Sequence, residues 1–138
     1  MIDVLAKATE NFITHQLRET SNKDKKNCLD EKHQSRIDLI TSGTKKEAYF
    51  YYTHKFIQTV SEVMLGEETQ DADALTDLIN ETTNMIAGSA KIVASESDAS
   101  NFDIGIPTYD GVCEPKNDGT FYAFYINNEL VLQIGVKD

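Results

Sequence analysis

The segment DALTDLINETTNMIAGSAKIVAS, residues 73–95, predicts the longest helix of the chain. At about 100° of rotation per residue, Asp77, Glu81 and Asn84 fall on one stripe of this helix, and Gly88 extends the stripe. A mostly apolar face lies about 140° away and consists of Leu75, Leu78, Ile79, Thr82, Met85, Ile86 and Val93. The helix is therefore expected to pack one face against a core and to present a polar stripe outward.

This polar stripe has two interpretations. A polar face opposite an apolar one is typical of any surface helix, and by spacing alone the stripe simply faces solvent. Alternatively, a carboxylate and a carboxamide one turn apart, as in Glu81 and Asn84, can enter a partner's site together. Spacing favours the first interpretation, and the second depends on what else the sequence offers.

The chain before this helix predicts two further helices and a hairpin. Residues 2–19 have the spacing of an amphipathic helix, whereas the polar residues 20–34 are expected to form a loop. Residues 36–41 and 48–52 alternate like two strands joined by a turn, which indicates a β-hairpin. A helix over 54–65 follows.

Local signals mark where that helix and the later strands begin and end. Thr53 is a suitable N-cap for the helix, and Gly66 is a suitable stop. Residues 102–107 resemble an edge strand, because Pro107 cannot donate to a sheet. Two more strands, 120–126 and 130–136, flank Asn127-Asn128, which is typical of a type I′ turn.

The order of these elements predicts the fold class. A helix, a hairpin, two consecutive helices and a run of strands indicate an α+β domain, with a mainly antiparallel sheet and the long helices packed on one face. A length of 138 residues is that of one ordinary domain, so we expect residues 1–138 to form a single domain.

Charge and composition argue against binding to nucleic acid or membranes and against secretion. The net charge of −10 argues against nucleic acid and against an anionic membrane surface, both of which attract clustered Lys and Arg. No segment has the length of a membrane span, and the charged N-terminus lacks the apolar run of about 7–15 residues of a signal peptide. Cys28 and Cys113 lie far apart and are expected to be reduced thiols. A cytoplasmic protein is therefore predicted.

The familiar catalytic and metal-binding patterns are missing from the sequence. His15, His33 and His54 are widely spaced and form no metal-binding motif. There is no G-x-S-x-G nucleophile elbow and no glycine-rich phosphate loop. Chemistry based on an internal nucleophile, or on a metal or cofactor of the protein's own, therefore has little support.

Residues 56–90 contain seven acidic residues and no Lys or Arg. The simpler interpretation is a solvated acidic face. The other is a docking surface for a partner that carries Lys or Arg, for which opposite charge would raise the association rate.

Three segments together resemble a known family. Asp77-x3-Glu81-x2-Asn84, continuing into the small residues 85–91 (MIAGSAK), resembles the signature helix of the CheC/CheX/FliY chemotaxis phosphatases. Residues 102–108 (FDIGIPT) resemble the strand that follows this helix in the family, and residues 63–67 (VMLGE) resemble the end of the preceding helix. The likeness extends over about residues 35–136.

A single copy of the signature helix resembles the CheX-like branch. That resemblance implies a homodimer, and it implies dephosphorylation of a phosphorylated CheY-like response regulator. The sequence departs from the family pattern in the polar, basic residues 20–34 and in the stretch after Pro107.

Within this resemblance, Asn84 is the candidate for orienting the attacking water, and Glu81 for docking to the active-site Lys of the regulator. Asp77 and Gly88 are candidate partner-binding residues, although helix packing explains Gly88 equally well. Mg²⁺ is expected in the partner response regulator rather than in this chain. A non-catalytic adaptor that binds a regulator or a motor component is the alternative.

Overall fold

The computed structural model describes residues 1–96, 101–116 and 119–137. Its centre is an antiparallel sheet in the order β1-β6-β7-β3-β2-β4, and β5 pairs with β2 beside β4. The strands are β1 (Asn22–Asp24), β2 (Lys32–Thr41), β3 (Thr44–Tyr52), β4 (Asp103–Ile104), β5 (Thr108–Cys113), β6 (Thr120–Ile126) and β7 (Glu129–Lys137).

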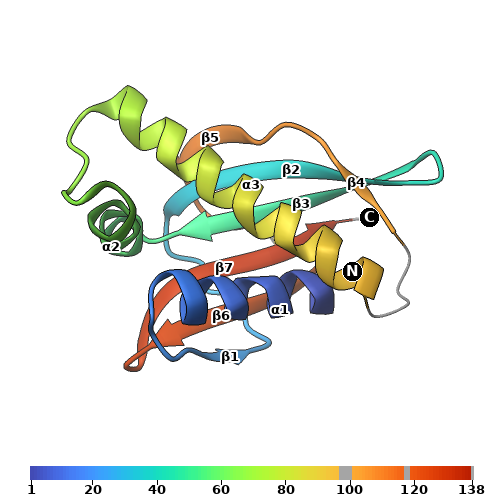
Figure 1. Ribbon diagram of the computed structural model, residues 1–138, viewed down its shortest axis with the longest axis horizontal. Helices are drawn as coiled ribbons and strands as arrows, with labels where there is room; N and C mark the ends of the chain where they lie inside the picture. Colours follow the sequence, from blue (N-terminus) through green and yellow to red (C-terminus); the bar gives the residue numbers. More distant parts are fainter. Residues whose placement is uncertain (97–100, 117–118, 138) are drawn as a thin grey trace.

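Two helices cover one face of this sheet. Helix α1 (Ile2–Asn11) and the long helix α3 (Ala72–Glu96) contact each other across that face, and α2 (His54–Leu65) lies at one end of the sheet (Figure 1). This arrangement confirms the predicted α+β fold, with a mainly antiparallel sheet and helices on one face. None of the helices in the described ranges has the length and apolar character needed to cross a membrane.

The predicted caps and turn are present. The Thr53 side chain accepts a hydrogen bond from the Phe56 amide at 3.2 Å, which starts α2. Gly66 ends the same helix with a φ of +82°, a conformation that glycine adopts without a steric penalty. Asn127 and Asn128 both have positive φ, as a type I′ turn between β6 and β7 requires.

The inward face of α3 packs on the middle of the sheet. Its buried side chains are Leu78, Ile79, Thr82, Thr83, Ile86, Ala87, Ala90 and Ala94. They meet fully buried side chains of the central strands, among them Leu39, Phe50 and Ile134. This apolar contact fixes the side of α3 that faces away from the sheet.

Strand β2 begins four residues earlier than the sequence pattern predicts, so the expected loop over residues 20–34 is partly wrong. Lys32, Gln34 and Ser35 are polar, yet all are buried in this strand. Burial is tolerated because each has a partner: the Lys32 amine donates to the carbonyl of Cys28 at 2.9 Å, and the Gln34 amide donates to Asp110 at 2.6 Å.

The other departures occur near the ends of the chain. The predicted helix over 2–19 is shorter, because α1 gives way to a π-helical turn at Phe12–Gln16. The stretch after Pro107 forms strand β5, which pairs with β2 across a bulge between Gln34 and Ser35. Within that stretch, residues 117–118 lie outside the described residues.

Residues 25–31 cover part of the sheet face opposite the helices. The side chain of Gln133, buried on β7, accepts a hydrogen bond from the Cys28 amide at 2.9 Å and donates one to the Asn27 side chain at 2.5 Å. A segment that is polar in sequence therefore serves as a second, smaller cover for the sheet.

Candidate functional site

The outward stripe of α3 borders a shallow hollow of about 500 Å³. The other wall of the hollow is the short connection between β4 and β5. Its lining residues are Asp77, Asn80, Glu81, Asn84, Gly105, Ile106 and Pro107. Three of the four residues predicted as site residues, namely Asp77, Glu81 and Asn84, are thus brought together, and all three are exposed.

Gly88 lies on the same stripe but in a neighbouring hollow of about 670 Å³, which Lys91 and Asp103 also line. A Cβ atom placed on Gly88 would meet no atom within 4 Å. Packing inside this chain therefore does not require glycine at this position.

Hydrogen bonds on the inner side of α3 fix the rotation of the stripe. The Ser35 hydroxyl on β2 donates to Asn80 Oδ1 at 3.1 Å. The Thr83 hydroxyl donates to the carbonyl of Ile79 at 3.0 Å and lies 2.9 Å from the hydroxyl of Tyr52 on β3. Because these bonds tie α3 to two strands, Glu81 and Asn84 are held facing the hollow.

The Tyr52 hydroxyl acts as the donor in that contact. Thr83 uses its only hydroxyl proton on Ile79, so the Thr83 oxygen accepts from Tyr52. Tyr52 is completely buried, and burial raises the pKa of its phenol well above the ordinary value. Tyr52 therefore stays neutral and donates a hydrogen bond to Thr83 on the sheet-facing side of α3.

The outward residues have the opposite character. Within residues 1–96, 101–116 and 119–137, the side chains of Asp77, Glu81 and Asn84 form no hydrogen bond or ion pair. The lining of the hollow includes two carboxylates and no Lys or Arg. Further along the stripe, the amine of Lys91 pairs with Asp103 at 2.8 Å. Among the described residues, the hollow is thus lined by two unpaired carboxylates, Asp77 and Glu81, and by the unpaired carboxamide of Asn84.

The connection between β4 and β5 is held firmly against β2. The Gly105 amide donates to the carbonyl of Asp38 at 2.9 Å, and a Cβ atom on Gly105 would lie only 3.3 Å from the Cβ of Asp38. Next to it, the Ile106 side chain is 89% exposed. Sequence reasoning assigned residues 102–107 to a strand and did not identify Ile106 as a surface feature of this site.

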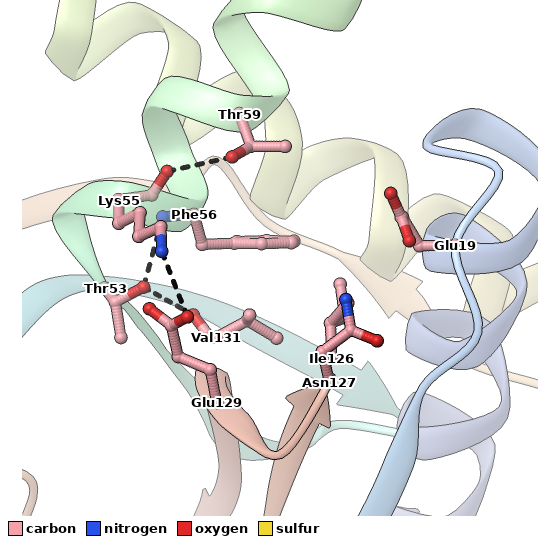
Figure 2. A pocket seen from close by; sticks show the side chains of 9 residues that line it. All are labelled: Glu19, Thr53, Lys55, Phe56, Thr59, Ile126, Asn127, Glu129 and Val131. Atoms are coloured by element: carbon pink, nitrogen blue, oxygen red, sulfur yellow. Dashed lines mark hydrogen bonds and ion pairs between the residues drawn. The ribbon is translucent and has the colours of Figure 1, made fainter.

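A separate hollow of about 180 Å³ lies between the start of α2 and the β6–β7 turn (Figure 2). Some of its polar groups are already paired: the amine of Lys55 contacts Glu129 at 3.0 Å, and the Thr53 hydroxyl donates to the carbonyl of Val131 at 3.2 Å. None of the predicted site residues lines it.

The fold also joins two histidines that the sequence leaves widely separated. His33 Nε2 lies 3.0 Å from His54 Nδ1, and His33 Nδ1 lies 2.7 Å from the hydroxyl of Tyr109. Burial, with a smaller effect from His54, lowers the pKa of His33. Across the described ranges, no group of three or more His, Cys, Asp or Glu side chains is placed to hold a metal ion.

The family model for chemotaxis phosphatase CheX matches residues 40–111, which is just over half of the chain and includes the whole outward stripe. The chain belongs to the CheX family. This confirms the resemblance drawn from the signature helix and its two flanking segments. A comparison with curated protein sequences finds no match.

Solved structures of chemotaxis proteins share the fold over nearly the whole chain. Chemotaxis protein CheX from Vibrio vulnificus is 18% identical, with a TM-score of 0.78 over 99% of this chain and 98% of that one. A CheC-like protein from Shewanella oneidensis MR-1 is 22% identical, with a TM-score of 0.74 over 99% and 95% of the two chains. CheX from Borrelia burgdorferi, in a complex with CheY, BeF3 and Mg²⁺, is 13% identical, with a TM-score of 0.69 over 99% and 96%.

Proposed function

We propose that this CheX-family chain hydrolyses the aspartyl phosphate of a CheY-like response regulator. The observation that carries the proposal is the pair Glu81 and Asn84, one turn apart on α3, exposed and without a partner among the described residues. In a helix that is otherwise well anchored to the sheet, these two side chains are free to enter the site of another protein.

The substrate makes the reaction feasible with few protein groups. An aspartyl phosphate is an activated acyl phosphate, so a water molecule can attack phosphorus directly. A bond forms between the water oxygen and phosphorus, the bond from phosphorus to the aspartyl oxygen breaks, and aspartate and inorganic phosphate result. Positioning and electrostatics supply most of the catalysis in phosphoryl transfer, which fits a site with no nucleophile of its own.

Each residue of the stripe has a proposed role. The Asn84 carboxamide has both a donor and an acceptor, and it would orient the attacking water. The Glu81 carboxylate would pair with the active-site Lys of the regulator and hold the helix in register. Asp77, one turn further from Asn84, would contribute to docking, and Gly88 would leave room for the partner.

The regulator, rather than this chain, would supply the metal ion for the reaction. Mg²⁺ would be held by carboxylates of the regulator and would neutralise charge on the phosphoryl oxygens. The Borrelia burgdorferi CheX complex, which contains CheY and Mg²⁺, supports a partner of this kind. A homodimer also stays a prediction, and light scattering would measure it.

The decisive experiment measures phosphate release from a phosphorylated CheY-like regulator. We expect Asn84→Ala to lower the rate by roughly 10²–10³-fold, the usual loss when one preorganised polar group is removed, with little change in binding. The matched control is Asn22→Ala, because Asn22 is an exposed amide on β1, at the opposite edge of the sheet from β4 and β5.

A second variant tests the docking role of the carboxylate. Glu81→Ala should weaken complex formation, whereas Glu62→Ala, an exposed carboxylate on α2, should not. Near-normal phosphate release by Asn84→Ala would overturn the assignment. Binding that depends on phosphorylation, with no turnover by the wild type, would favour the adaptor alternative.

A further inference from the structure

Ile106 is the most exposed large apolar side chain in the described part of the chain, at 89%, and the next, Ile92, is 60% exposed. Single exposed apolar residues are common on protein surfaces and need no explanation by themselves. Ile106 differs because it lines the same hollow as Glu81 and Asn84. Ile106 therefore lies beside the outward stripe of α3, to which the proposed function assigns the activity.

The backbone on both sides of Ile106 is fixed. Ile104 pairs with Leu39 of β2, and Thr108 pairs with Arg36 of the same strand. Between them, the Gly105 amide is bonded to Asp38, and the ring of Pro107 restricts its own φ. Little backbone conformational entropy therefore remains to be lost when a partner covers the Ile106 side chain, and preorganisation of this kind favours binding.

We propose that Ile106 is a docking residue whose side chain seats on apolar surface beside the phosphoaspartate pocket of the regulator. This inference rests on the proposed function and extends it to a second wall of the site. Glu81 and Asn84 supply polar contacts from α3, and Ile106 supplies an apolar contact from the β4–β5 connection.

The chemistry of the hollow supports this particular partner. Its lining contains the carboxylates of Asp77 and Glu81 and no basic group, so it complements a surface that presents a lysine amine. An apolar residue beside such a charged contact excludes water from it, an arrangement found around the residues that dominate binding energy in interfaces. Ile106 is in the right place to seal the edge of the contact made by Glu81.

The test measures binding to a CheY-type receiver domain loaded with beryllofluoride and Mg²⁺, a probe that needs no turnover. Ile106→Ala should raise the dissociation constant about tenfold. Ile106→Asp should raise it about a hundredfold, because a carboxylate would replace the isoleucine against the apolar surface of the partner and would be desolvated there without a hydrogen-bonding partner. The control is Leu29→Ala, since Leu29 is 53% exposed in the segment that covers the opposite sheet face.

Kinetics separate docking from catalysis. Ile106→Ala should raise the KM for the phosphorylated regulator and leave kcat unchanged, the signature of an interaction that is equal in ground and transition states. All three variants should keep the wild-type melting temperature, because the altered side chains are exposed.

Two outcomes would overturn the proposal: wild-type affinity in Ile106→Asp, or a fall in kcat with unchanged affinity in Ile106→Ala. If the proposed phosphatase function is wrong, the experimental result differs from these two outcomes. In that case the wild type would bind the loaded regulator without releasing phosphate, and the affinity comparison at Ile106 would still decide the docking role. An absence of binding by the wild type would overturn both.

Discussion

The two sides of α3 use their polar groups differently. On the inward side, the Thr83 hydroxyl donates to Ile79 and lies within hydrogen-bond distance of Tyr52. On the outward side, Glu81 and Asn84 have no partner among the described residues. Polar groups on the inward side stabilise the fold, whereas under the proposed function Glu81 and Asn84 on the outward side contact a second molecule.

This contrast separates stability from function along a single helix. Substitutions on the inward side should lower the free energy of unfolding while the folded fraction keeps its activity. Those at Asp77, Glu81 or Asn84 on the outward side should change activity or binding and leave stability within about 0.5 kcal/mol, as is usual for surface positions. The predictions below test that separation, in order of decreasing expected effect on stability.

The largest loss of stability is expected from Ile79→Ala. Ile79 is fully buried between α3 and the sheet, and truncation of such a side chain leaves a cavity that costs about 2–5 kcal/mol. Urea unfolding would measure the change. The control is Ile92→Ala, because Ile92 is on the same helix and largely exposed. Equal losses in the two variants would contradict the division of the helix into two sides.

An intermediate loss is expected from Thr83→Val. The substitution keeps the shape of the side chain but leaves the buried Tyr52 hydroxyl without its acceptor, which costs about 1–3 kcal/mol. Thr59→Val on α2 is a close control, because the Thr59 hydroxyl also bonds the carbonyl four residues back but contacts no buried phenol. Similar unfolding free energies for both variants would refute a special role for the Tyr52 contact.

A smaller effect of opposite sign is expected from Gly88→Ala. Glycine inside a helix is less stable than alanine by about 0.5–1 kcal/mol, and nothing lies within 4 Å of the new Cβ atom. Thermal unfolding should therefore show a more stable protein. Weaker binding to the loaded regulator in the same variant would support close approach of the partner at Gly88, and unchanged binding would leave Gly88 without a role there.

The smallest effect is expected from pH, through an inward-facing group on β2. The pKa of His33 is lowered in the folded protein, so the unfolded chain binds a proton more readily. Protonation of His33 therefore favours the unfolded chain. The stability associated with neutral His33 is fully present above the unfolded pKa of about 6.5 and is lost as the pH falls below it.

Melting temperatures between about pH 7.5 and 5.5 would reveal the loss. The dependence should be weaker in His33→Gln and should persist in His15→Gln, because His15 is an exposed residue of the π-helical turn. An identical pH profile in His33→Gln and the wild type would contradict a role for His33.

Local signals in the sequence predicted much of the fold. The caps at Thr53 and Gly66 and the turn at Asn127-Asn128 depend on nearby residues, so sequence reasoning placed them correctly. The first residues of β2 were missed, because Gln34 is buried only in combination with Asp110, which is distant in sequence. Polar strands of this kind satisfy their hydrogen bonds through tertiary contacts that no short-range pattern records.

The same distinction applies to the candidate site. Helical spacing was enough to predict that Glu81 and Asn84 lie on one side of the helix. The family resemblance then suggested a role for each of them. Ile106 could not be found in this way, because its relation to the stripe depends on how β4 and β5 attach to β2. The contact of His33 with His54 likewise depends on where β2 ends relative to the start of α2.

The position of β7 in the sheet has a consequence for how the protein folds during synthesis. β7 lies between β6 and β3, so it alone joins the β1–β6 pair to the strands on the other side. It is also synthesised after every other strand of the sheet. Until β7 is synthesised, β6 and β3 lack the strand that lies between them in the sheet. Long-range pairing of this kind slows folding and leaves the edges of these strands unpaired in the meantime. A nascent chain stalled before residue 129 would be a natural client for a chaperone.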